Sequence, residues 1–146
     1  MVGFFLAMIS GALMSIQGVF NTGVTKQTGV WLASGFVSLT GFIVCVIMWF
    51  IKERQQVAPL EILKVDNKYM LLGGVIGAFI TFTVIKSMEN LGPAKAVLII
   101  VISQVLVAYL IELFGMFKVD KVGFSISKLV GILVAITGLV IFKWKS

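Results

Sequence analysis

Histidine is absent from this sequence, and cysteine occurs once, at Cys45. An intrachain disulfide is therefore excluded, and metal sites built from histidine and cysteine lack ligands, so we expect no metal and no cofactor. Charge is also scarce, because only 12% of the 146 residues are charged, whereas soluble domains carry roughly 25%. Hydrophobic residues make up 60% of the chain. This composition leaves too little polar surface for a soluble domain and predicts an integral membrane protein.

Acidic residues are the rarer charge, six against twelve lysines and arginines, and the net charge is +6. Most basic residues flank apolar runs, which is typical of orientation control and headgroup contact rather than of nucleic-acid binding. Hydrolysis or group transfer needs paired acid and base groups or an activated nucleophile. Only Glu112, Glu89 and Lys86 are candidates for such groups in the apolar runs. We therefore expect the lipid bilayer as a partner, no nucleic acid and no enzymatic activity.

Five apolar runs are long enough, or nearly long enough, to cross a bilayer core, which takes about 20 helical residues. The predicted spans are residues 2–25, 28–51, 69–91, 93–117 and 123–142, with a loop at residues 52–68. The fifth run is the weakest, because it is free of charge only from Leu129 onwards. Lys128 must therefore reach towards the headgroups, or the bilayer must thin there. The prediction is an all-α membrane protein with residues 1–146 as a single domain, a bundle of five transmembrane helices.

Polar side chains follow one face of the first run. Ser10, Gln17 and Asn21 are spaced by seven and four residues, which places them on one side of a helix. We expect this side to face other helices. In the second run Ser38 belongs to a stripe of small residues, together with Ser34, Gly41 and Cys45. Helix packing is the simpler role for that stripe, because small residues let membrane helices approach closely.

The fourth run carries two groups that lipid rejects, Gln104 near its centre and Glu112 two turns further on. A carboxylate inside a span is costly unless it faces protein, a partner charge or water, so Glu112 is a candidate functional residue. The alternative is that Glu112 lies near enough to the helix end to reach the headgroups. At the end of the third run, Lys86 and Glu89 are three residues apart and could pair on one helix face. A solvated helix end is the simpler role for this pair.

Positive charges are almost equally divided between the two sides of the membrane that five spans would define. On the N-terminal side there are seven, Lys52, Arg54, Lys64, Lys68, Lys118, Lys121 and Lys128. On the other side there are five, Lys26, Lys86, Lys95, Lys143 and Lys145. The lysine and arginine bias sets orientation, so these counts give only a weak preference for an internal N-terminus. We therefore predict insertion in both orientations and pairing with an inverted copy; the alternative is a single orientation.

Two segments resemble a known family. The first segment is GALMSIQGVFN, from Gly11 to Asn21, and the second runs from Ile102 to Phe117. In the second segment Gln104 is followed eight residues later by an acid, and the pattern continues with Leu-Phe-Gly: Glu112, Leu113, Phe114 and Gly115. Both resemble the YdcZ-like family of small inner-membrane proteins in the drug/metabolite transporter (DMT) superfamily. The turn LGPAKA at Leu91 to Ala96 is similar to the turn between helices 3 and 4 in the wider superfamily. The resemblance covers essentially the whole chain.

The resemblance implies a five-helix unit that is half of a 5+5 inverted-repeat DMT architecture, in the bacterial inner (cytoplasmic) membrane. It implies an exporter that works as a dual-topology homodimer or with an oppositely oriented paralogue. Two positions depart mildly from the family pattern, Ser103 where glycine is common and Glu112 where aspartate is usual. The related small multidrug transporters have a glutamate in the first helix that binds both proton and cation. Gln17 lies in that region and cannot titrate, so their coupling scheme does not carry over.

Inverted repeats bind substrate near the membrane midplane and alternate access by rocking one half against the other. We therefore expect Gln17, Asn21, Ser38 and Gln104 from both copies to line a pocket for a small polar or cationic solute. The predicted gating or ion-coupling residues are Glu112, Lys86 and Glu89, with Glu112 pairing with Lys86 of the other copy. The alternative is an accessory or structural subunit that needs a second, oppositely oriented chain. The substrate, the coupling ion and the direction of transport stay open.

Overall fold

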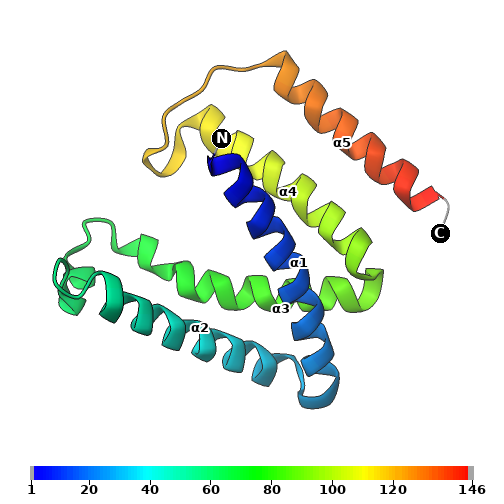
Figure 1. The fold of residues 1–146 in the computed structure, drawn as a ribbon. Coiled ribbons are helices and arrows are strands. Elements are labelled where there is room, and N and C mark those ends of the chain that lie inside the picture. Colours follow the sequence, from blue (N-terminus) through cyan, green and yellow to red (C-terminus); the bar gives the residue numbers. More distant parts are fainter. Residues whose placement is uncertain (1, 145–146) are drawn as a thin grey trace. The chain divides into compact units, whose positions relative to one another are not determined.

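Helices make up most of the chain in the computed structural model, which describes the backbone of residues 2–144 and the side chains of residues 2–142 (Figure 1). Of the charges counted above, Lys145 and the side chain of Lys143 lie outside the described residues. The long helices are α1 (Val2–Thr28), α2 (Val30–Lys52), α3 (Gly73–Leu91), α4 (Pro93–Phe114) and α5 (Ile126–Trp144). Three short 3-10 turns join them, η1 (Pro59–Lys64), η2 (Lys68–Leu72) and η3 (Met116–Lys118).

Among the described residues, four helical segments are long and apolar enough to cross a membrane. These segments are Val2–Thr28, Val30–Lys52, Lys68–Leu91 and Pro93–Phe114, the third of which joins η2 to α3. In α5 the apolar part, Ile126–Phe142, is shorter. The prediction of an all-α membrane protein is therefore confirmed, whereas the fifth span and the half-repeat architecture stay predictions.

The chain divides into two compact units, Met1–Lys86 and Ser87–Ser146, and the division falls within α3. In the first unit α1 and α2 contact each other. The joint between them is a single residue, Gly29. Three residues close to this joint in the sequence are buried, namely Asn21, Ala33 and Ser34. The Trp31 ring at the start of α2 stacks on Phe82 of α3, with centroids 4.8 Å apart. Aromatic stacking thus holds α2 against the third helix of this unit.

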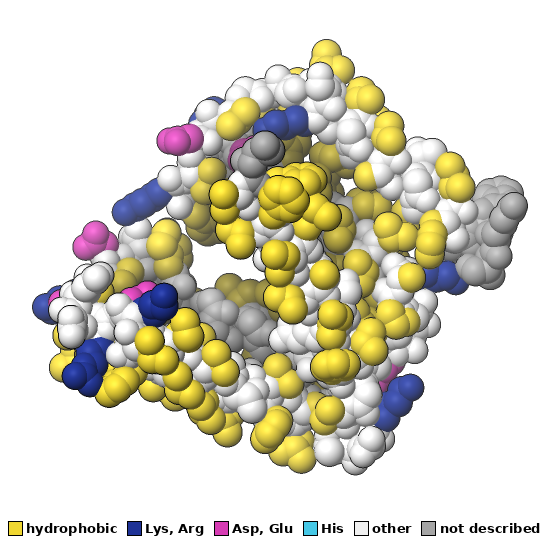
Figure 2. Space-filling view, viewed as in Figure 1, with side chains coloured by type: hydrophobic (Ala, Val, Ile, Leu, Met, Phe, Trp, Pro, Cys, Tyr) yellow, Lys and Arg dark blue, Asp and Glu magenta, His cyan; other side chains and the backbone are white. Residues whose placement is uncertain are grey.

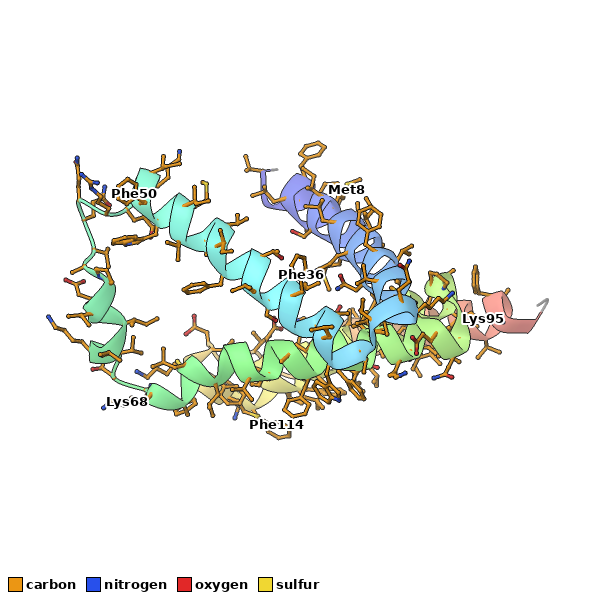
Figure 3. All side chains as sticks on the ribbon, turned by 90° about the horizontal axis from the view of Figure 1, so that it is seen from below. Met8, Phe36, Phe50, Lys68, Lys95 and Phe114 are labelled. Carbon is orange, nitrogen blue, oxygen red and sulfur yellow. The ribbon has the colours of Figure 1, made fainter. Side chains whose placement is uncertain are left out.

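The segment between α2 and η2 contains the short turn η1, and the loop bounds of 52–68 stay a prediction. The indole nitrogen of Trp49 donates a hydrogen bond to the carbonyl of Val57 at 3.1 Å, and the Arg54 guanidinium lies 4.5 Å from the centre of the Phe50 ring. These contacts fold the start of the loop back over the end of α2, where Figure 3 labels Phe50. Charged side chains gather at this loop in Figure 2.

In the second unit α4 ends at Phe114, earlier than the predicted span end at residue 117. The apolar run continues through Met116 and Phe117, but Gly115 adopts the left-handed conformation (φ 64°) and stops the helix. A Cβ at this position would lie 3.2 Å from the Cβ of Lys121, so only glycine suits both the backbone and the close approach. The chain then crosses to α5, which begins at Ile126 rather than at residue 123.

Most large apolar side chains are exposed, as the hydrophobic atoms spread over the helices in Figure 2 show. Figure 3 labels some of them, including Met8, Phe36 and Phe50, which project from α1 and α2. Within the described part of the chain, the buried hydrophobic side chains are Ala33, Ile85, Met88, Ala96, Tyr109 and Ile132. Such a surface is unfavourable in water at about 25 cal/mol per Å², but lipid tails are as apolar as these side chains. The distribution is that of a chain surrounded by lipid or by other membrane helices.

Candidate functional site

Glu112 forms an ion pair with Lys128, which lies in the first turn of α5. The Lys128 Nζ donates a hydrogen bond to the Glu112 Oε2 at 2.7 Å. In the isolated chain the Glu112 side chain remains 41% exposed and the Lys128 side chain 43% exposed. In water an exposed pair of this kind contributes only about 0–1 kcal/mol to stability. In a membrane its effect is larger, because a carboxylate in lipid is costly unless a cation is beside it.

Two backbone N–H groups position this pair, because their hydrogen bonds fix the segment between α4 and α5. The N–H of Val122 donates to the main-chain carbonyl of Glu112 at 2.9 Å. The N–H of Ser125 donates to the Tyr109 hydroxyl, also at 2.9 Å. The segment is therefore attached to two successive turns of α4, and α5 starts directly after the second attachment. This geometry directs Lys128 towards Glu112.

A cavity of about 350 Å³ lies beside the ion pair, on the facing sides of α4 and α5. Tyr109, only 8% exposed, forms part of its wall, and the Lys128 Nζ lies 5.2 Å from the centre of the Tyr109 ring. The remaining walls are apolar. They are formed by Val105 and Ala108 of α4 and by Gly131 and Ile132 of α5. We call Tyr109, Glu112, Lys128 and this cavity the α4–α5 site.

The α4–α5 site combines a carboxylate with an aromatic face, two groups that attract a cation. It contains no pair of acids and no nucleophile beside a base. Among the residues described, no three acidic or cysteine side chains come close enough together to hold a metal ion. The arrangement is thus suited to binding a charged solute.

Residues 2–141 match the family described as "Putative inner membrane exporter, YdcZ". The chain belongs to this YdcZ family. The resemblance seen at residues 11–21 and 102–117 is thereby confirmed, and the match supports a transporter of the inner membrane rather than an enzyme. No curated protein and no solved structure matches the chain.

The pocket residues predicted for this YdcZ-family chain are divided between its two units. In the first unit Asn21 is buried at 7% exposure, whereas Gln17 and Ser38 are exposed. In the second unit Gln104 is exposed on α4 and, with Ser103 and Ile111, borders a shallow groove. Gln104 lies about 12 Å from Glu112 along the helix axis. The prediction that these four residues share one pocket stays a prediction.

The predicted gating residues also differ in their surroundings. Lys86 and Glu89 are exposed on α3, and the predicted pairing of Glu112 with Lys86 of another copy stays a prediction. Within its own chain, Glu112 contacts Lys128. Sequence reasoning treated Lys128 only as a side chain that reaches for the headgroups. The signal that could have revealed it was the position of Lys128 shortly after a loop that follows the only acidic residue of the fourth span.

Two hydroxyl side chains of the first unit were not predicted as site residues. Thr25 and Ser34 are buried, and neither hydroxyl oxygen has a hydrogen-bond partner within the described part of the chain. A buried polar group without a partner costs about 1–3 kcal/mol. Thr25 continues the spacing of Gln17 and Asn21 along the same face of α1, and this spacing could have identified it. The polar face of α1 therefore extends to the end of the helix.

Proposed function

We propose that this chain is an exporter of a small polar or cationic solute that works by alternating access as an antiparallel, dual-topology homodimer. The observation that carries the proposal is the Glu112–Lys128 pair beside the cavity of the α4–α5 site. A charge pair at the rim of a cavity in a membrane helix can attract a solute and can open or close with it. Family membership and the nearly balanced positive charges support the same function.

In the proposed dimer, Gln17, Asn21, Ser38 and Gln104 of both copies form the floor of the substrate pocket. Inverted repeats place such residues near the midplane, at the interface of the two halves. Amide and hydroxyl groups bind a polar solute through neutral hydrogen bonds. The pocket thus binds the solute without adding charge to the membrane interior.

Glu112 has two alternative partners in this proposal. One is Lys128 of its own chain, at 2.7 Å, and the other is Lys86 of the inverted copy, beside Glu89. Exchange of the carboxylate between these two lysines couples the rocking of the halves to opening and closing of the pathway. Each state keeps the carboxylate next to a cation, which a membrane environment requires.

The test is efflux from proteoliposomes that contain the purified protein and radiolabelled tetramethylammonium. We expect Glu112→Gln to reduce the rate at least about ten-fold, because the neutral amide cannot form a charge-assisted hydrogen bond with Lys128. Glu61→Gln, at an exposed position of the loop turn η1, is the matched control and should transport normally. A wild-type rate for Glu112→Gln would contradict the proposed gate.

A second candidate function is an accessory subunit that does not transport by itself and needs an oppositely oriented, different chain. The short apolar part of α5 favours it, because an incomplete span is less suited to closing a pathway without help. Gln17→Ala and Gln104→Ala distinguish the candidates in the same assay. An exporter transports as the purified wild type and loses transport in both variants while remaining folded, whereas an accessory subunit shows no transport even as the purified wild type.

A further inference from the structure

The ammonium group of Lys128 occupies a position that a free organic cation could fill. It lies 2.7 Å from a carboxylate oxygen of Glu112 and 5.2 Å from the centre of the Tyr109 ring. A carboxylate together with the face of an aromatic ring is a combination that recognises ammonium ions, quaternary ones included. The surroundings of the lysine ammonium are therefore those that an ammonium ligand requires.

The cavity beside the ammonium group has room for substituents that lysine itself does not carry. Its volume of about 350 Å³ is within the range of small-molecule sites, roughly 300–1,000 Å³. The apolar side chains that line it on both helices would contact the alkyl groups of such an ion. A strongly hydrated inorganic cation gains little from these walls, so the lining favours an organic ammonium.

The recognising groups are held more firmly than the lysine that occupies the site. Tyr109 is buried, and its hydroxyl is fixed by the N–H of Ser125. The backbone of Glu112 is fixed by Val122. Lys128, by contrast, reaches the carboxylate at the end of a flexible four-carbon chain. It can leave the carboxylate while the rest of the site stays in place.

We propose that the α4–α5 site binds small organic ammonium ions and that Lys128 is its built-in competitor. Entry of the ligand displaces the lysine from Glu112, and the lysine returns when the ligand leaves. The carboxylate therefore has a cation beside it at every stage. This inference names the substrate class of the proposed exporter and rests on that proposal for its role in transport.

The first test measures binding of tetramethylammonium chloride to the full-length protein in lipid nanodiscs by calorimetry, with sodium chloride at equal concentration as the reference. In Lys128→Met the competitor is gone. We expect affinity to rise at least about ten-fold, because a site that is free only part of the time shows a proportionally weaker apparent affinity. Glu112→Gln should abolish binding. Unchanged or weaker binding by folded Lys128→Met would overturn the competitor role.

The second test uses the wild-type protein and so does not depend on whether a variant folds. Lysine acetylation is followed by mass spectrometry during titration with tetramethylammonium. We expect acetylation of Lys128 to rise several-fold as the ligand displaces it, while acetylation of Lys95, near the start of α4, stays constant (Figure 3). A constant Lys128 signal would contradict the displacement.

Binding without efflux would leave this inference standing and contradict the exporter function, whereas efflux with no binding at Glu112 would contradict this inference alone.

Discussion

At the residue scale, Tyr109 has two tasks in the α4–α5 site. Its ring forms part of the cavity wall beside the Lys128 ammonium, and its hydroxyl accepts the hydrogen bond from Ser125. The second task fixes where α5 begins and therefore where Lys128 points. Removing the hydroxyl alone separates the two tasks.

We expect Tyr109→Phe to loosen the segment between α4 and α5 while leaving the aromatic face in place. A lost hydrogen bond of this type costs about 1 kcal/mol. Hydrogen–deuterium exchange should therefore accelerate severalfold at residues 115–125. Tyr69→Phe, at an exposed tyrosine of η2 in the first unit, is the control and should leave exchange in that segment unchanged. Equal protection of residues 115–125 in wild type and Tyr109→Phe would show that Ser125 is held by something else.

Glu112 could be found from the sequence because a carboxylate stands out in an apolar run. Its partner could not, because Lys128 lies sixteen residues away. Whether the two side chains meet depends on the path of the intervening segment. That path is fixed by the left-handed Gly115 and by hydrogen bonds to Glu112 and Tyr109, which no hydropathy pattern contains.

At the scale of elements, α1–α2 and α3–α4 are joined in the same way. Each joint is one glycine, Gly29 with φ 90° and ψ 153° and Gly92 with φ 79° and ψ 157°. In both joints the glycine N–H bonds to the carbonyl four residues earlier. The glycine carbonyl accepts from the alanine four residues later, and these alanines, Ala33 and Ala96, are 1% and 0% exposed. The chain thus uses one type of joint twice.

Both glycines lie in a backbone region that is essentially restricted to glycine, where another residue costs about 1–3 kcal/mol. A Cβ added to either glycine would meet no atom within 4 Å, so the cost comes from the backbone alone. We expect Gly29→Ala and Gly92→Ala to lower the free energy of unfolding by this amount, measured by denaturant titration in detergent. Gly11→Ala, inside α1, should cause no loss. Equal stability of all three variants would contradict the strain.

The sequence predicted the joint at Gly92 because Gly92-Pro93 is a recognisable stop and start for helices. Each of the first four apolar runs overlaps one of the helices α1 to α4, since lysines and glycines bound the runs, while the predicted span bounds stay predictions. The sequence misplaced the end of α4 because hydropathy continues beyond Phe114, while the backbone turns at Gly115. Hydropathy measures where lipid is tolerated, and the end of a helix depends on local conformation.

At the scale of the whole molecule, the predicted topology of five spans leaves a small difference in positive charge between the two sides, seven against five. We expect reporters fused to the C-terminus to be active on both sides of the membrane. Replacing Lys52 and Arg54 by glutamine equalises the two counts and should increase the share of chains with the opposite orientation. Strong activity of only one reporter, unchanged in the double variant, would instead indicate a single fixed orientation and a different partner chain.

The ion pair between α4 and α5 also has a consequence for biosynthesis. An unpaired acidic or basic residue at a helix centre opposes insertion by the translocon by about 2.5–3.5 kcal/mol, and less towards helix ends. Glu112 is near the end of α4 and Lys128 near the start of α5, so the two charges leave the ribosome close together. If the two side chains pair early, the ion pair reduces the insertion penalty of both charges before either helix is surrounded by lipid. We therefore expect α4 and α5 to enter the bilayer together as a hairpin, with the fourth helix retained at the translocon until the fifth has been made.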